Sequence, residues 1–411
     1  MQKILLSVVF TTSVLMASQS LSELIEAAHQ NELVDVYVQK EKGTKLSRES
    51  LKAAYMPRID LGASGSFVDE KGTMDVGESY TAYATASVLV FDGFKRENAL
   101  DELRSRINAS SSDLKGYKKA LSLEVTQAYF RLLNVYGDIE AQEQSKKQLQ
   151  EELKRQKRFL SARIVTEEEV ERIHAALANT EYEIATLQYS ADKYESMLYT
   201  LSGIKIDALK ESQLSIPKYK KPQQLDSIQS LRHQSDATRY LAEQSTSSYY
   251  PSLSVQDTYG FYDYQNYSEA FPIDRVDKQN RLMVVASMNL FDFFSSSKQK
   301  QSIMAQQQAL SSQIAYEEKR SNANIALSKK AIERSYTLLD AANVGLSASL
   351  KTFEAIEKKY RANIVDYVKY LDALYQKSNA QAQLNRAENA LQLAYAQYYY
   401  YAGFDIKEYV R

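Results

Sequence analysis

The stretch Lys359-Tyr360-Arg361-Ala362-Asn363-Ile364-Val365-Asp366 has an earlier counterpart in the chain, Arg158-Phe159-Leu160-Ser161-Ala162-Arg163-Ile164-Val165-Thr166. Three of its residues recur at a constant shift, since Ala162, Ile164 and Val165 return as Ala362, Ile364 and Val365, and 362 − 162 = 200. The chain is therefore a tandem repeat, and each copy of such a repeat is expected to form the same supersecondary unit.

The repeat extends far beyond this stretch. Phe91-Asp92 recurs as Phe291-Asp292, and Leu201-Ser202-Gly203 has its counterpart in Tyr401-Ala402-Gly403. Upstream, the pattern Tyr-x-Pro places Pro57 opposite Pro251, and the shift falls to 251 − 57 = 194. Between this proline and the Phe-Asp pair the copies thus differ by 200 − 194 = 6 residues of loop.

The composition favours long, uninterrupted elements and excludes several classes of function. Among 411 residues there are only 12 Gly and 5 Pro, so helix breakers are few. The net charge of −1 gives no basic footprint for nucleic acid. Because the chain has no Cys, it offers no thiol nucleophile, no thiolate metal ligand and no disulfide.

The N-terminus predicts export. Lys3 precedes an apolar run from Ile4 to Met16, and small residues follow, a pattern typical of a secretory signal peptide over residues 1–18. The alternative, a short membrane anchor, is disfavoured because roughly 20 apolar residues are needed to span a bilayer. No later segment is apolar enough for a spanning helix, so a membrane could be crossed only by strands.

Four segments alternate between apolar and polar residues, as half-buried strands do. The first has apolar residues at odd positions from Ile59 to Phe67, and the second at even positions from Ala82 to Val90. The third alternates from Ser252 to Phe261. In the fourth, we expect the lipid-facing residues to be Leu282, Val284, Ala286, Met288 and Leu290.

Four strands cannot close a barrel, since roughly eight are needed before an interior exists. Strands in lipid must therefore belong to a barrel shared between chains. A soluble antiparallel sheet lying on the helices would show the same alternation and stays open as the alternative.

Long helices account for most of the remaining chain. We expect helices over residues 22–54, 95–160 and 166–201 in the first copy, the last begun by a capping box of Thr166 and Glu169 and ended by Gly203. In the second copy we expect them over 226–248 and 297–360, followed by a helix that Asp366 caps and that ends at Gly403. The corresponding domains are a signal peptide (1–18), a first repeat (19–203), a linker (204–222), a second repeat (223–403) and a C-terminal tail (404–411).

This order of elements resembles the TolC-type outer membrane factors, the outer membrane efflux protein family. The most specific stretch is Tyr360 to Ala373, which leads into a helix rich in Ala, Gln and Asn. The resemblance implies a mainly α fold with transmembrane β: three chains each give four strands to a shared twelve-stranded β-barrel, which a long α-helical coiled-coil tunnel continues through the periplasm.

The resemblance also implies a function. Such proteins are passive exit ducts of tripartite efflux pumps or type I secretion systems, located in the bacterial outer membrane, and they bind no cofactor and catalyse no reaction. The expected partners are two further copies in a homotrimer, a periplasmic adaptor, an inner-membrane pump and outer membrane lipid. The substrate, whether drug, metal or protein, does not follow from the sequence.

Two sets of site residues follow from the resemblance. The helix turns would dock the adaptor through Ala162, Arg163, Ile164, Val165, Ala362, Asn363, Ile364 and Val365. The periplasmic gate would be formed by Asp372, Lys369 and Asp366. Lys369 stands where the family commonly has an acid, so a mixed-charge constriction is expected. The plainer alternative is a solvated helix face with a three-residue ion-pair spacing.

An enzyme is not expected. The three histidines, His29, His174 and His233, are far apart and form no His-x-x-x-His pair, which excludes a metalloprotease motif. Gly62-Ala63-Ser64-Gly65 lies within an expected strand and lacks the lysine of a phosphate-binding loop. The competing function is that of a secreted or periplasmic helical scaffold with a soluble β-sheet.

Overall fold

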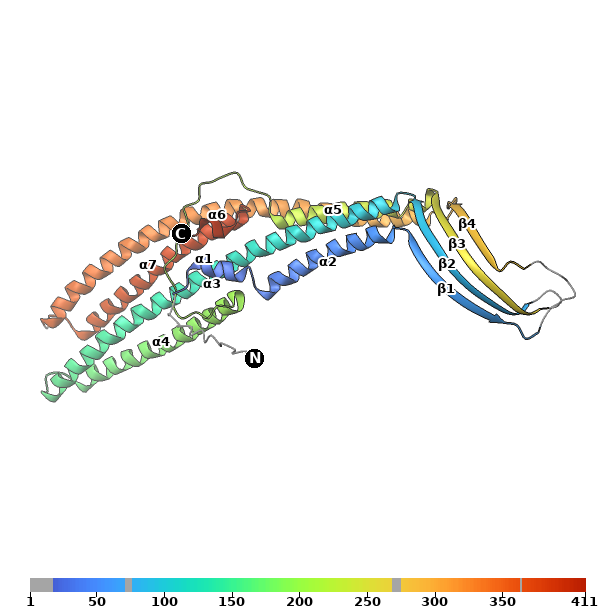
Figure 1. Ribbon diagram of the computed structural model, residues 1–411. Helices are drawn as coiled ribbons and strands as arrows, with labels where there is room; N and C mark the ends of the chain where they lie inside the picture. Colours follow the sequence, from blue (N-terminus) through green and yellow to red (C-terminus); the bar gives the residue numbers. More distant parts are fainter. Residues whose placement is uncertain (1–17, 71–75, 268–274, 363) are drawn as a thin grey trace, which may run out of the picture. The chain divides into compact units, whose positions relative to one another are not determined.

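The computed structural model describes residues 18–70, 76–267, 275–362 and 364–411 (Figure 1). The predicted signal peptide, Ser18 apart, lies outside them. The chain divides into two compact units, one comprising residues up to 36, 114–226 and 318–411, the other 37–113 and 227–317. Each unit takes segments from both copies of the repeat, so the copies are units of sequence rather than separate folding units.

The elements recur at the shift that the sequence shows. In the first copy they are α1 (Leu21–Ala28), α2 (Glu32–Ala54), β1 (Arg58–Phe67), β2 (Val76–Asp92), α3 (Lys95–Ser161) and α4 (Glu167–Ser202). In the second copy they are α5 (Asp226–Gln244), the short 3-10 helix η1 (Ser247–Tyr249), β3 (Ser252–Tyr267), β4 (Lys278–Ser287), α6 (Ser295–Arg361) and α7 (Tyr367–Tyr401). A final 3-10 helix, η2, spans Ile406–Tyr409. Both long helices, α3 and α6, have 67 residues, as the scarcity of breakers predicts.

The two helix turns have matching backbones. Ile164 donates its N–H to the carbonyl of Phe159 at 2.9 Å, and Ile364 donates to that of Lys359 at the same distance. The following helices begin alike, because the side chains of Thr166 and Asp366 accept the N–H groups three residues on, at 3.4 and 2.9 Å. Only this half of the predicted capping box at Thr166 forms among the described residues.

The predicted helix over residues 22–54 is wrong in one respect, because the structure divides it at residues 29–31. The amide of Asn31 explains the break. Its oxygen accepts the N–H of Val34 at 2.9 Å and thus caps α2, while its nitrogen donates to the carbonyl of Leu201 at 3.1 Å. Asparagine competes in this way with the helical backbone, so that α1 ends and α2 starts anew.

The four strands form one antiparallel sheet in the order β1-β2-β3-β4, so that β2 and β3 join the two copies. Residues opposite each other in the register share a face of the sheet. One row, Ile59, Ala86, Asp257 and Leu282, is apolar except for Asp257. The adjacent row, Asp60, Thr85, Thr258 and Arg281, is polar, and its two threonine hydroxyls lie 3.1 Å apart.

The register thus gives the sheet one largely apolar and one polar face. The fourth strand is shorter than expected, since β4 ends at Ser287 and both Met288 and Leu290 follow it. Leu282, Val284 and Ala286 lie within β4, on the face that also carries Ile59 and Ala86.

The predicted linker and C-terminal tail are parts of a packed core. Leu209 pairs with Gln19 in a parallel bridge, and Leu214 pairs with Val410 in an antiparallel one. Tyr129 donates its hydroxyl to the carbonyl of Lys210. Around these contacts lie fully buried side chains from α1, α3, α4, α7 and η2, namely Leu21, Leu24, Ile25, Phe130, Leu198, Tyr398 and Ile406.

The junction from strand to long helix is also repeated. Asp92 and Asp292 accept the backbone N–H groups of Arg96 and Ser296 at 3.0 and 2.9 Å. Tyr249 donates its hydroxyl to Asp292 at 2.6 Å, and hydrogen bonds from Ser296 and Tyr249 lower the pKa of Asp292 to about 2.

The two residues after each aspartate have positive φ angles, 70° and 65° at Gly93 and Phe94, and 51° and 64° at Phe293 and Phe294. Phenylalanine rarely adopts this conformation, so the turn is imposed by the packing around it. A Cβ atom on Gly93 would lie 2.3 Å from the carbonyl oxygen of Ser247, whereas Phe293 has room for a side chain that is 86% exposed.

Gly93→Ala should destabilise the protein more than Gly203→Ala. Both glycines have a φ near 70°, so each substitution costs about 1–2 kcal/mol of backbone strain. Only at Gly93 does the new methyl group also collide with backbone, which adds about 1–3 kcal/mol. Urea unfolding followed by far-UV circular dichroism measures both losses, and equal losses would contradict the steric role of Gly93.

Candidate functional site

The turns of the two helix hairpins lie at the same end of their unit (Figure 1). Ile164 is 68% exposed at the first turn, and Ile364 is 71% exposed at the second. Ala162, Arg163 and Ala362 are also exposed, Val165 and Val365 are half-buried, and Asn363 lies outside the described residues. Each turn therefore presents an isoleucine at its tip.

Arg163 has a φ of 57°, in the left-handed region. A backbone hydrogen bond holds it there, because the backbone N–H of Arg163 donates to the carbonyl of Leu160 at 2.9 Å. An L-residue pays about 1–2 kcal/mol for this conformation.

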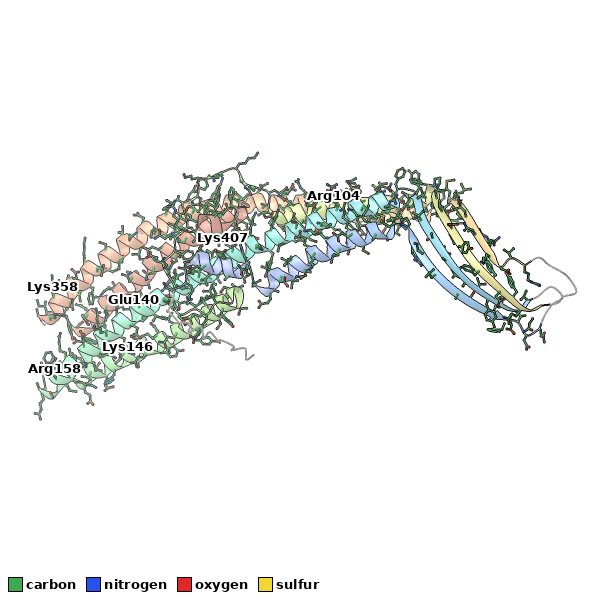
Figure 2. The ribbon with its side chains drawn as sticks, in the orientation of Figure 1. Arg104, Glu140, Lys146, Arg158, Lys358 and Lys407 are labelled. Carbon is green, nitrogen blue, oxygen red and sulfur yellow. The ribbon has the colours of Figure 1, made fainter. Side chains whose placement is uncertain are left out.

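Charges surround both tips. Arg158 and Lys358 are equivalent positions, since 358 − 158 = 200, and they lie near the ends of α3 and α6 (Figure 2). Basic residues in the last turn of a helix interact favourably with its dipole, as do acids in the first. The last turn of α6 holds Lys358, Lys359 and Arg361, and the first turn of α4 holds Glu167, Glu168 and Glu169.

A buried cluster behind the turns joins the two hairpins. Glu152 on α3 is 7% exposed and Tyr360 on α6 is 6% exposed. Tyr360 donates its hydroxyl to Oε1 of Glu152 at 2.5 Å, and Gln156 donates its amide to the same oxygen at 2.8 Å. Arg155 places Nη1 3.5 Å from Oε2 of Glu152 and its guanidinium 4.7 Å from the centre of the Tyr360 ring.

These partners compensate a carboxylate that would otherwise be costly to bury. Tyr367 and Tyr370 on α7 pack beside Tyr360, with ring centres 5.9 and 4.8 Å from it. Burial raises the pKa of Tyr370 to about 12, and it also raises the pKa values of Tyr360 and Tyr367. All three hydroxyls are therefore protonated at neutral pH, and Tyr360 can donate to Glu152.

The predicted gate residues lie on the other side of α7. Asp366 is the N-cap and accepts the backbone N–H of Lys369 at 2.9 Å. Lys369 and Asp372 are both exposed, and Asp372 accepts the side-chain amide of Gln376 at 2.9 Å. The chain thus brings Asp366 and Lys369 together through a backbone contact, while Asp372 bonds further along the helix.

Sequence reasoning missed the Glu152–Tyr360 cluster. One signal was present: Glu152 and Gln156 are four residues apart, as are residues on one face of a helix. Tyr360 is 208 residues from Glu152 in the chain, however, and no periodicity links them.

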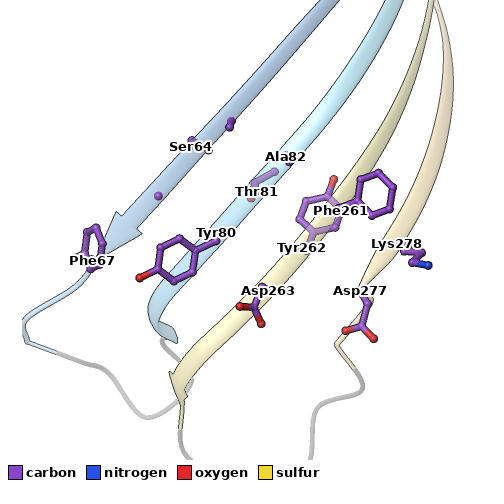
Figure 3. A pocket seen from close by; sticks show the side chains of 12 residues that line it. Ser64, Phe67, Tyr80, Thr81, Ala82, Phe261, Tyr262, Asp263, Asp277 and Lys278 are labelled. Carbon is purple, nitrogen blue, oxygen red and sulfur yellow. The ribbon is translucent and has the colours of Figure 1, made fainter.

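A hollow of about 780 Å³ lies on the sheet (Figure 3). Phe67 and Tyr80 meet edge to face there at 5.8 Å, and Asp263, Asp277 and Lys278 lie along its other side. Over the described residues, no group of three His, Cys, Asp or Glu side chains could hold a metal ion. Nor does any helix in the described ranges have the length and apolarity to cross a membrane.

Comparisons with known proteins agree with this geometry. Residues 44–204 match the family model of the outer membrane efflux proteins. Among solved structures, the chain is similar to the outer membrane protein VceC of Vibrio cholerae, with 16% identity, a TM-score of 0.80, and 94% of this chain and 96% of VceC covered.

It is also similar to the CmeC outer membrane channel of Campylobacter jejuni, at 16% identity and a TM-score of 0.82, over 94% of this chain and 86% of CmeC. The open state of the MtrE outer membrane channel of Neisseria gonorrhoeae is similar as well, at 15% identity and a TM-score of 0.76, over 94% of this chain and 89% of MtrE. No curated protein matches the chain in sequence. The four-stranded sheet on paired long helices is thus the fold of these channels.

Tyr360→Phe should loosen the hairpin ends. Loss of the hydroxyl removes a hydrogen bond to a buried carboxylate, which costs about 1.5–3 kcal/mol. Hydrogen exchange at amides of residues 353–361 and 367–374 should then be about tenfold faster or more, since 1.4 kcal/mol corresponds to a factor of ten. Tyr375→Phe is the matched control, because Tyr375 is 60% exposed on α7. Equal protection in both variants would refute the role of the cluster.

Proposed function

We propose that the chain is an outer membrane efflux protein that forms the exit duct of a tripartite efflux pump or of a type I secretion system, because residues 44–204 match that family's model and the fold is that of outer membrane channels. As an outer membrane efflux channel it is located in the outer membrane, extends into the periplasm and is not an enzyme. The earlier alternative, a secreted or periplasmic scaffold, is set aside because it conflicts with this location. Which of the two export systems the duct serves is part of the proposal.

One observation carries the proposal: the sheet exposes a broad apolar face. Ile59 is 74% exposed, Leu61 83%, Leu282 67% and Val284 64%. Contiguous apolar surface of this kind is rare on soluble proteins and marks contact with protein or lipid. We assign this face to the lipid of the outer membrane and the polar face to a water-filled interior.

The edges of the sheet support a trimer. In lipid, the unpaired backbone groups of β1 and β4 have no water to bond, so the sheet must close on itself through other copies. Two copies would give eight strands, whose interior is filled by side chains, whereas three give twelve strands and leave a lumen. A homotrimer with a shared barrel, continued by the long helices, is therefore the proposed assembly.

The turns are the proposed docking site for a periplasmic adaptor that connects the duct to an inner-membrane pump. Exposed Ile164 and Ile364 offer apolar contacts, and the basic end of α6 beside the acidic start of α4 offers charges of both signs. In a trimer, two turns per chain give six such tips. This arrangement supports contact with a partner that has several similar binding elements.

The exposed face of α7 is the proposed gate. Three-fold symmetry would bring three copies of Lys369 and of Asp372 around one axis, and Asp366 would support them as the cap of α7. Rings of opposite charge one helical turn apart would form a mixed-charge constriction, which a channel could open by separating the hairpins.

Val284→Lys should prevent stable assembly, and Val285→Lys should be tolerated far better. The two valines are neighbours on β4, but Val284 lies opposite Val255 while Val285 lies opposite Ser254. A lysine facing lipid at mid-depth costs about 2–4 kcal/mol, and one facing water costs much less. Detergent-extracted trimer, measured for both variants at equal expression, tests the assignment. Normal assembly of Val284→Lys would count against the lipid-facing side.

Replacing both Lys369 and Asp372 by Ala should raise the single-channel conductance in planar bilayers, because each substitution shortens a side chain that would project into the proposed constriction and removes its charge. The control is the double substitution Glu169→Ala with Arg172→Ala, at the equivalent positions of the first copy, since 369 − 169 and 372 − 172 are both 200. Unchanged conductance in the first variant, or an equal rise in both, would remove the gate from this face of α7.

A further inference from the structure

The segment between α4 and α5 carries basic residues that the proposed function does not use. Residues 216–222 include Lys218, Lys220 and Lys221 and contain no acidic residue. All three lysines are exposed, and none of them forms an ion pair with any residue that the structure describes. Asp226, the next acid along the chain, is already paired with Lys119 at 2.7 Å. The loop therefore presents positive charges that this chain leaves without partners within the described ranges.

Backbone hydrogen bonds fix both ends of this loop. Ser215 donates its N–H to the carbonyl of Tyr409 at 2.8 Å, and Gln223 donates to that of Ala402 at 2.9 Å. Pro217 is buried between these two anchors, and a proline has only one free backbone dihedral. Figure 1 shows the segment as a loop outside the helices of its unit. The lysines thus stand on a short loop that is held in place.

Tyr219 lies among the lysines and packs against the core. Its ring meets that of the buried Tyr398 edge to face at 5.3 Å, and the ammonium group of Lys329 on α6 lies 5.2 Å from its centre. The side chain is nevertheless 54% exposed. A ring held in this way offers a flat apolar surface with a hydroxyl at its edge, which suits the face of a sugar. We call Tyr219 and the cations around it, Lys218, Lys220, Lys221 and Lys329, the basic patch.

The basic patch belongs to the core that packs at the middle of α3. Tyr129 donates its hydroxyl to the carbonyl of Lys210, which lies in the same segment as the loop. Tyr129 is 129 − 95 = 34 residues from the start of α3 and 161 − 129 = 32 residues from its end. At 1.5 Å per residue, about 50 Å of helix lies on either side. Along α3, the segment is thus as far from the strand junction as from the helix turn.

We infer that the basic patch binds the cell-wall glycan of the periplasm, peptidoglycan, through the carboxylates of its peptides and the faces of its sugars. The inference rests on the proposed function, because a duct that leads from the outer membrane to an inner-membrane pump passes through the cell wall. The unpaired lysines attract carboxylates, and Tyr219 gives a sugar ring a flat contact. An anionic membrane surface is the competing occupant, but the patch lies halfway along α3 rather than at either end.

The contact should be weak for one patch and firm for the assembly. An exposed ion pair contributes little by itself. A trimer presents three patches, and the glycan repeats its carboxylates many times, so simultaneous binding raises the avidity by about 10²–10⁴. Because salt screens exposed charges, raising the ionic strength should weaken the binding.

Co-sedimentation of the full-length, detergent-solubilised protein with purified, protein-free sacculi tests the inference. The test variant replaces the three lysines of the loop, with Lys218→Gln, Lys220→Gln and Lys221→Gln, and should bind at least tenfold more weakly. The matched control removes the same charge from three exposed lysines of α2, with Lys40→Gln, Lys42→Gln and Lys45→Gln, and should bind as the unchanged protein does. Equal losses in both variants would overturn the inference.

Sacculi whose carboxylates have been converted to amides identify the group that is recognised. The unchanged protein should bind them at least tenfold more weakly than native sacculi, and undiminished binding would overturn the inference. Vesicles that contain an anionic phospholipid test the competing occupant. Binding to these vesicles through the same three lysines, without binding to sacculi, would assign the patch to a membrane surface instead.

Single-channel conductance in planar bilayers reports the proposed duct separately. The test variant should conduct as the unchanged protein does, because the loop is not part of the proposed constriction. Conductance without binding to sacculi would overturn the inference and leave the duct intact. Binding to sacculi by a protein that forms no channel would overturn the proposed duct while the basic patch keeps its partner.

Discussion

Unpaired backbone at the two edges of the sheet is the constraint on which the rest of the structure depends. Strands β2 and β3 pair across the two copies of the repeat, and among the described residues this leaves the outer edges of β1 and β4 without partner strands. In water these unpaired N–H and C=O groups can bond to solvent, but the core of a bilayer contains no water to bond them. The apolar face that the sheet exposes makes lipid the better surroundings, and there only further strands can satisfy the edges.

Within the unit that holds the turns, the two hairpins meet through polar contacts. Helix α3 packs against α7 through the pairs of Asn134 with Asn389 and of Asp138 with Arg386. Glu152 on α3 also meets Tyr360 on α6, and both side chains are buried. Buried polar pairs need well-defined partners, so these contacts fix how the two hairpins pack against each other.

Duplication also allowed the copies to diverge where their surroundings differ. Gly93 has no side chain because the carbonyl of Ser247 lies against it, and the equivalent Phe293 is exposed. Both junctions nevertheless keep the capping aspartate and the positive φ angles, since the change of direction from strand to helix is the same. The two junctions thus share one backbone conformation, while their side chains differ because different neighbours lie beside them in each copy.

Much of the architecture could be predicted because it follows from local patterns. The constant shift of 200 residues, the alternation in the strands, the lack of breakers in the long helices and the caps at Thr166, Gly203 and Asp366 are each visible within a few residues of chain. Local patterns failed where a side chain has a choice of partners. Asn31 ended a helix that looked continuous, and β4 stopped before Met288.

The sequence by itself determined the repeat, the order of strands and helices, and the family that this order resembles, because periodicity and capping are properties of neighbouring residues. Only the tertiary structure decided that Glu152 meets Tyr360, that residues 204–222 pair with both chain ends, and that α3 meets α7. These contacts join residues up to 255 positions apart. Their formation depends on how whole elements pack, and no local pattern encodes that.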